Sequence, residues 1–215
     1  MYPLFQDRVE AGRLLAAELR EIGPIRDGIV VAVPRGGVVV GAEVAKALDT
    51  PMDIIVPRKI GAPFNPEAAV GAVTEDGTAI FDERALKLLG LTRESLEETV
   101  KAQLAEIARR TMLYRSGRDP LPLKGKTVIL VDDGVATGYT TLAALRSVKK
   151  ARPAKVILAV PVAPPDTAEM LSGEVDEMVC LFTPEPFYAV GQFYRRFDQT
   201  TDEEVIALLS RHRRA

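Results

Sequence analysis

Short apolar runs alternate with helical patterns of apolar positions along most of this chain. Apolar residues recur with a helical period over residues 6–22, a helix that contains small residues is expected over 38–48, and a long charged helix is expected over 92–115. Continuous aliphatic and β-branched runs predict buried strands at 28–33, 53–56, 128–131, 154–160 and 175–182. This alternation of strands and helices predicts an α/β fold with a doubly wound, mainly parallel sheet.

One segment, residues 128–141 with the sequence VILVDDGVATGYTT, combines acids with a glycine loop. Asp132 and Asp133 follow a buried strand, at the edge where open α/β sheets bind their ligands. The small residues after them let backbone N–H groups converge on an anion, helped by the start of a helix. This anion-binding stretch consists of Gly134, Val135, Ala136, Thr137, Gly138, Tyr139, Thr140 and Thr141. The two carboxylates can accept hydrogen bonds from sugar hydroxyls, and the adjacent loop can bind a phosphate. This combination suits a ribose 5-phosphate.

Three other interpretations compete for this segment. A nucleotide triphosphatase loop requires a lysine after its last glycine, where this chain has Tyr139. A receiver domain also uses acids at strand ends, but it would leave the glycine loop without a purpose. An ordinary strand-turn-helix junction with a capping aspartate stays open.

Two further segments carry cations that suit a pyrophosphate. The strand at 28–33 is followed by Arg35, Gly36 and Gly37. The planar guanidinium of the arginine can donate to phosphate oxygens, and the glycines have no side chains that would keep a phosphate away from the backbone. Arg58 and Lys59 begin a long excursion over residues 57–67, which is expected to close over a ligand. The alternatives are a tight turn with a solvent-facing arginine and a solvated basic loop.

The composition narrows the class of protein. The chain has 215 residues, is 47% apolar and has a formal net charge of −2, so it has no global attraction to nucleic acid or anionic membranes. Its one cysteine, Cys180, cannot form an internal disulfide, and no run approaches the roughly 18 apolar residues of a membrane span. We expect a soluble cytoplasmic protein with no membrane partner.

The segment VILVDDGVATGYTT resembles the phosphoribosyl pyrophosphate signature of the type I phosphoribosyltransferases. The resemblance implies that Asp132 and Asp133 meet the ribose hydroxyls and that residues 134–141 hold the 5-phosphate. It also implies a pyrophosphate loop with a strained or cis peptide at or next to Arg35–Gly36, and a mobile catalytic loop that carries Arg58 and Lys59. Bacterial proteins that combine VPRGG, RKIGAPFNPE and VDDGVATG resemble family members without an assigned acceptor base.

The same resemblance implies a reaction. The family transfers 5-phosphoribose from phosphoribosyl pyrophosphate to a nitrogenous base in nucleotide salvage, with Mg²⁺ held mainly by substrate and water near Asp132 and Asp133. An aromatic residue before a Val-Gly pair covers the base in purine-type members, which points to Tyr188 with Phe187 as its neighbour. The metal-associated aspartate expected after that pair is missing, and packing of these rings into a core or a dimer contact is the alternative.

The sequence also predicts how the chain is organised into domains, and it leaves alternative functions open. One domain is expected over residues 1–215, with a core at about 25–182 and a hood from about 1–24 and 183–215. The family also implies a symmetric homodimer. A regulator on the same fold that senses phosphoribosyl pyrophosphate without chemistry, or that binds RNA, is the alternative function. His212, in a basic tail that is expected to fray, receives no role.

Overall fold

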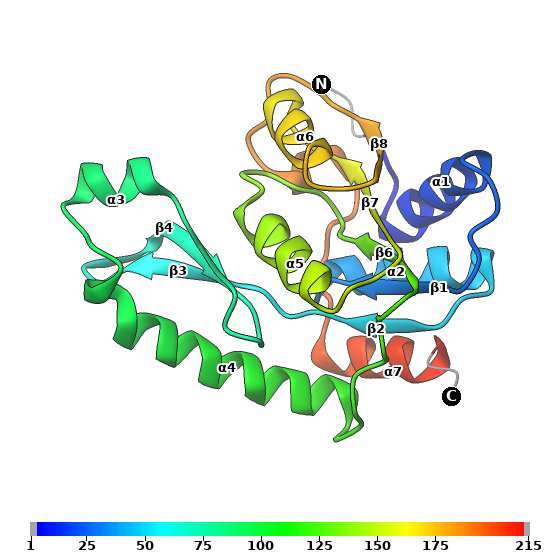
Figure 1. Cartoon of the computed structure of the whole chain (residues 1–215). Helices are drawn as coiled ribbons and strands as arrows, with labels where there is room; N and C mark the ends of the chain where they lie inside the picture. The colour runs from blue at the N-terminus through cyan, green and yellow to red at the C-terminus, as the bar shows by residue number, and fades with distance from the viewer. Residues whose placement is uncertain (1–3, 213–215) are drawn as a thin grey trace.

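The main sheet of the protein contains five parallel strands (Figure 1). The computed structural model describes residues 4–212, apart from the side chains of residues 66 and 67. The strand order is β2–β1–β6–β7–β8, with neighbours paired in parallel register. The strands are β1 (Gly28–Ala32), β2 (Met52–Ile54), β6 (Thr127–Val131), β7 (Lys155–Val162) and β8 (Glu177–Phe182). The predicted parallel sheet is therefore confirmed.

Helices cover both faces of this sheet, as a doubly wound fold requires. Alternate strand residues face opposite sides, so Val30 and Ile129 belong to one apolar core while Val31 and Val128 belong to the other. The first face packs against α1 (Arg8–Glu21), α2 (Gly36–Leu48) and α7 (Asp202–His212). The second packs against α5 (Tyr139–Lys150) and α6 (Pro165–Ser172).

A second group of elements, residues 58–115, projects from the main sheet and is called the arm below (Figure 1). Its antiparallel sheet has the order β3–β4–β5. Its elements are β3 (Arg58–Ala62), β4 (Asn65–Val73), β5 (Ala79–Phe81), α3 (Glu83–Leu89), a short 3-10 helix η1 (Glu94–Leu96) and α4 (Glu97–Arg115). The long charged helix expected over residues 92–115 is confirmed by η1 and α4. The excursion expected over residues 57–67 leaves the main sheet as the start of the arm, where β3 pairs with β4, and its closing over a ligand stays a prediction.

A buried ion cluster joins the base of the arm to the main sheet. The Arg115 side chain is only 7% exposed, and its Nε donates to Oδ1 of Asp53 at 3.0 Å while its Nη1 lies 3.2 Å from Glu75. Asp53 also accepts from the backbone N–H of Leu121. Since a buried charge is costly without partners, this cluster fixes where the arm leaves the sheet.

The two terminal segments meet at the carboxyl end of the main sheet. Phe5 pairs with Tyr194 and packs with Phe193 and Val162, the last residue of β7. Helix α1, which was expected in the hood, packs on the main sheet, and residues 1–3 and 213–215 lie outside the described part. His212, which was expected in a frayed tail, is the last residue of α7, and the rest of that basic tail lies outside the described residues. Among the described residues, no helix is both long and apolar enough to cross a bilayer.

Candidate functional site

A cleft of about 860 Å³ lies between the carboxyl edge of the main sheet and the arm. Residues predicted from the sequence line it from four different segments: Arg35, Gly36, Arg58, Lys59, Asp132, Asp133 and Thr140. Helix α4 adds a third side with Thr99 and Gln103. Segments that are far apart along the chain therefore place the two predicted acids, three cations and a helix start around one cavity, and α4 adds a third acid, Glu98.

Asp132 and Asp133, called the acid wall, directly follow the end of β6. The Asp133 side chain is 15% exposed, and its Oδ2 accepts a hydrogen bond from Arg8 Nε at 2.7 Å. The backbone N–H of Asp133 donates to Oδ1 of Asp132 at 2.8 Å. Burial and the Asp133 carboxylate raise the pKa of Asp132, and burial raises the pKa of Asp133 although Arg8 opposes it. Such a pair favours ligands that donate hydrogen bonds.

Two glycines allow the first turn of α2 to approach the acid wall. A Cβ on Gly36 would lie 1.8 Å from Oδ2 of Asp133, and one on Gly37 would lie 2.9 Å from the Asp132 Cα. Any side chain here would displace the acids. The peptide bond between Pro34 and Arg35 is cis, which agrees with the strained or cis peptide expected at or next to Arg35–Gly36.

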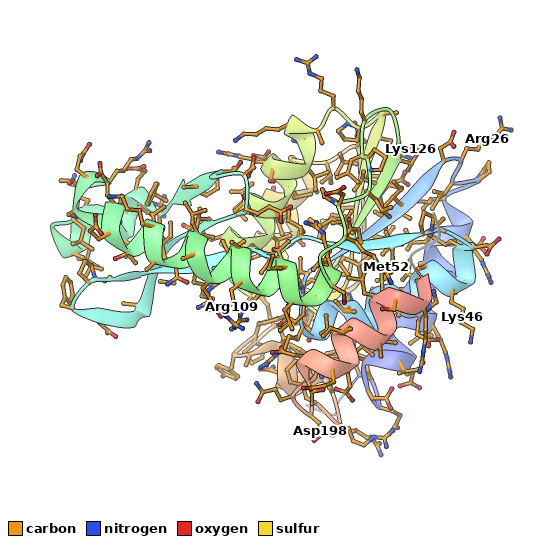
Figure 2. All side chains as sticks on the ribbon, turned by 90° about the horizontal axis from the view of Figure 1, so that it is seen from below. Arg26, Lys46, Met52, Arg109, Lys126 and Asp198 are labelled. Atoms are coloured by element: carbon orange, nitrogen blue, oxygen red, sulfur yellow. The ribbon has the colours of Figure 1, made fainter. Side chains whose placement is uncertain are left out.

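Arg35 reaches the cleft from this turn and is held loosely. Its Nη1 lies 3.6 Å from Oδ1 of Asp202, the first residue of α7, and its side chain is 31% exposed. The Tyr114 hydroxyl donates to the same oxygen at 2.7 Å. Burial raises the pKa of Tyr114 to about 12, so this hydroxyl keeps its proton. Figure 2 shows α4 and α7, which supply Tyr114 and Asp202, side by side.

Arg58 and Lys59, called the basic wall, enter the cleft from β3. Nε of Arg58 donates to Oε1 of Gln103 at 2.6 Å, so α4 orients this guanidinium. Burial, followed by the nearby charge of Arg110, lowers the pKa of Arg58. Lys59 is exposed. The arm therefore carries one oriented cation and one exposed cation opposite the acid wall.

The loop between β6 and α5 has the features of an anion site. Within the described part of the chain, the backbone N–H groups of Ala136 and Thr137 donate to no backbone or side-chain acceptor. Gly138 caps α5 with a φ of 80°, a conformation that favours glycine. Val135 is buried and donates its N–H to Val162, and the half-buried Val190 side chain closes the loop on the side of Gly134.

The hydroxyls of this segment face different surroundings. Thr140 lines the cleft, and Thr137 is exposed. The Thr141 side chain is buried inside the fold, and the Tyr139 hydroxyl pairs with Asp82 of the arm. Only part of the predicted segment therefore presents side chains to a ligand in this conformation.

The predicted aromatic pair lies outside the cleft. Tyr188 is 84% exposed, whereas the Phe187 ring packs against Phe193 with centroids 4.9 Å apart. Val190, two residues after Tyr188, contacts Gly134. The pair thus lies near the anion loop, and its role in covering a base stays a prediction.

Three residues around the cleft were not found from the sequence: Arg8, Gln103 and Tyr194. Arg8 bonds to Asp133 across 125 positions of the chain, and the Tyr194 hydroxyl donates to the Asp133 carbonyl at 2.5 Å. Gln103 lies on the long charged helix, whose sequence pattern marked no binding residue. No local pattern marked them, because their partners lie in distant segments.

Comparison with known proteins gives consistent results. The family model described as "Phosphoribosyl transferase domain" matches residues 6–195. The Mycobacterium tuberculosis protein named "Putative phosphoribosyl transferase Rv0571c" is 44% identical over 211 residues. That match covers 98% of this chain and 47% of the relative, so the chain spans about half the length of the curated relatives it matches.

Solved structures show the same fold. The crystal structure of TT1426 from Thermus thermophilus is 42% identical, with a TM-score of 0.82 over 99% of this chain and 100% of that one. A hypothetical protein from Neisseria gonorrhoeae, solved with bound ppGpp, has a TM-score of 0.52 at 15% identity, covering 99% of this chain and 97% of that one. This second likeness concerns the fold alone.

Proposed function

We propose, because this chain belongs to the phosphoribosyl transferase domain family, that it transfers 5-phosphoribose from phosphoribosyl pyrophosphate to a nitrogenous base. Pyrophosphate is the leaving group. The observation that carries this proposal is the single cleft that holds Asp132, Asp133, Arg35 and Arg58 beside the start of α5.

The acid wall and the anion loop bind the donor in this proposal. The carboxylates of Asp132 and Asp133 accept hydrogen bonds from the ribose hydroxyls, each contributing about 1.5 to 3 kcal/mol. The N–H groups of residues 134–141 and the first turn of α5 bind the 5-phosphate. These contacts hold the anomeric carbon of the sugar in one position, which is the main contribution of a site that works by orientation.

The cations bind the pyrophosphate as it leaves. When the bond at the anomeric carbon breaks, negative charge grows on the pyrophosphate and positive charge on the sugar ring. The negative charge on the pyrophosphate is stabilised by Arg35, Arg58 and Lys59. The positive charge on the sugar ring is stabilised by the acid wall. Gln103 accepts from Nε of Arg58, and no described residue accepts from the terminal nitrogens of this guanidinium, so these nitrogens can bind phosphate oxygens.

Magnesium fits this site in the manner usual for phosphate substrates. No group of three or more His, Cys, Asp or Glu side chains among the described residues could hold a metal ion. Mg²⁺ commonly uses one or two carboxylates with substrate oxygens and water, and Asp132 and Asp133 supply such carboxylates. When bound, the ion neutralises charge on the pyrophosphate.

A flat, purine-like base is the proposed acceptor. A ring nitrogen with a lone pair forms the new bond to the anomeric carbon as the bond to pyrophosphate breaks, and the base gives up its ring N–H proton to solvent or to the departing pyrophosphate. The exposed Tyr188 ring, close to the anion loop through Val190, offers a face for stacking.

The experiment is an acceptor panel. The protein is incubated with phosphoribosyl pyrophosphate, Mg²⁺ and individual purine and pyrimidine bases, while pyrophosphate release and nucleotide formation are measured. We expect release that depends on one class of base and that falls by about 100-fold or more in Asp132→Asn/Asp133→Asn. Tight donor binding without product for any base would instead favour the sensing regulator.

A further inference from the structure

Arg8, in the first turn of α1, is buried at the junction of three segments around the acid wall. Its side chain is only 12% exposed. Nε donates to Asp133 at 2.7 Å, Nη1 donates to the carbonyl of Asp198 at 2.7 Å, and the guanidinium lies 3.8 Å from the centre of the Phe197 ring. A planar guanidinium can donate in its plane and stack through its face at the same time, so the three contacts are compatible.

The start of α1 is itself fixed, so Arg8 is not a loosely placed surface cation. The Asp7 carboxylate caps the helix by accepting from the N–H groups of Val9 and Glu10. The backbone of the adjoining segment pairs with the carboxyl-terminal segment, because the N–H of Arg195 donates to the Phe5 carbonyl. Both ends of the chain therefore hold Arg8 against the acid wall.

Arg8 does not line the cleft, although Asp133 does. Any influence on a ligand in the cleft therefore passes through Asp133. The donor sugar carries several phosphate charges, and two adjacent half-buried carboxylates repel such a ligand. A guanidinium behind one of them offsets part of this repulsion and restricts the rotation of the carboxylate.

We propose that Arg8 is a positioning residue for the donor sugar, which orients Asp133 for the ribose hydroxyls and compensates its charge. This inference rests on the proposed function. It links donor affinity to the packing of the two terminal segments, since Phe197 and Asp198 hold the other side of the guanidinium.

The test is a double-mutant cycle on donor binding. Calorimetry measures the Kd for phosphoribosyl pyrophosphate with Mg²⁺ in wild type, Arg8→Gln, Asp133→Asn and the double variant. The matched control is Arg13→Gln, which removes a 69% exposed arginine of the same helix that pairs with Glu43. Circular dichroism and thermal unfolding verify that each variant folds.

We expect Arg8→Gln to raise the Kd by about tenfold, the effect of losing one charge-assisted hydrogen bond. In the Asp133→Asn background, Arg8→Gln should change the Kd less than about twofold, because the carboxylate that Arg8 binds is already gone. Arg8→Lys keeps the charge without the planar fork, so it gives an intermediate increase of about threefold. Arg13→Gln leaves the Kd unchanged. If Arg8→Gln does not fold, the Arg8→Lys pair with and without Asp133→Asn gives the same comparison.

Two results overturn the inference while the proposed function stands. An unchanged or lower Kd in Arg8→Gln means that Arg8 is dispensable or competes with the sugar for Asp133. If Arg8→Gln lowers donor affinity equally with and without Asp133→Asn, then Arg8 acts through the fold and not through this carboxylate. Absence of donor binding in the wild type overturns the proposed function itself, and the positioning role with it.

Discussion

On the acid wall, Asp133 is held from three directions: Arg8 binds its carboxylate, Tyr194 binds its carbonyl, and Gly36 lies against its side chain. On the basic wall, Arg58 has one hydrogen bond to Gln103, and Lys59 is exposed. The first wall grows from the main sheet and the second from the projecting arm (Figure 1). The cleft thus combines a closely held side, the fixed wall, with a side whose cations have fewer contacts.

The difference suits a group transfer in which one part of the substrate stays and another part departs. A sugar that must present its anomeric carbon accurately benefits from a preorganised wall. A pyrophosphate that gains charge and then leaves benefits from cations that follow it and release it. Each wall can be altered separately, so the contrast can be tested.

Removing the charge of the acid wall has the largest expected effect. Asp132→Asn/Asp133→Asn keeps the shape of both side chains but loses two charge-assisted hydrogen bonds, so kcat/KM falls by about 100-fold or more. Pyrophosphate release measures this loss. Asp166→Asn, at an exposed position of α6, serves as the control. Full activity in the double variant would contradict the role of these acids.

Gly36→Ala tests whether the acid wall is rigid. The new methyl group would lie 1.8 Å from Oδ2 of Asp133, so the carboxylate or the turn must shift. We expect donor affinity to fall by about tenfold, the loss of one charged hydrogen bond. Gly173→Ala is the matched control, since its nearest neighbour is 3.7 Å away. An unchanged Kd would mean that the acids move freely and that the contrast between the walls is false.

Neutralising the basic wall separates the two cations. Arg58→Gln should lower kcat by about tenfold with little change in donor Kd, because its contact strengthens only as the pyrophosphate departs. Lys59→Gln should have a smaller effect, since no described side chain orients it. Steady-state kinetics and calorimetry distinguish these outcomes. An equal loss of donor binding in both variants would indicate ordinary ground-state contacts.

Tyr188→Ala has the smallest expected effect and concerns the acceptor alone. Loss of one stacking face should raise the KM for the base about fivefold, with the donor Kd unchanged. Tyr188→Phe, which keeps the ring, should behave as wild type. An unchanged KM in Tyr188→Ala would remove this residue from the acceptor site.

Much of the fixed wall could be predicted from the sequence. The run Val128–Val131 is apolar because it is buried on both faces, and this burial is what made the strand and the two acids after it recognisable. The glycines of the turn at 35–37 were informative for a similar reason. This turn packs closely against the acid wall, so only residues without side chains fit there.

The arm and the supporting contacts could not be predicted in the same way. Strand β3 begins with Arg58 and Lys59 and therefore lacks the apolar run of a buried strand. Helix α3 is short, with Leu86 as its one buried residue, and α7 was hidden in a charged tail. The contact between Arg8 and Asp133 forms only when folding brings two distant segments together. A local pattern of apolar and polar residues therefore could not predict it.

The most direct measurement is a crystal structure of the protein with phosphoribosyl pyrophosphate and Mg²⁺. The account predicts ribose hydroxyls within hydrogen-bonding distance of Asp132 and Asp133, with the 5-phosphate on the N–H groups of residues 134–141. A donor bound elsewhere, or one whose ribose does not touch these two acids, would contradict it.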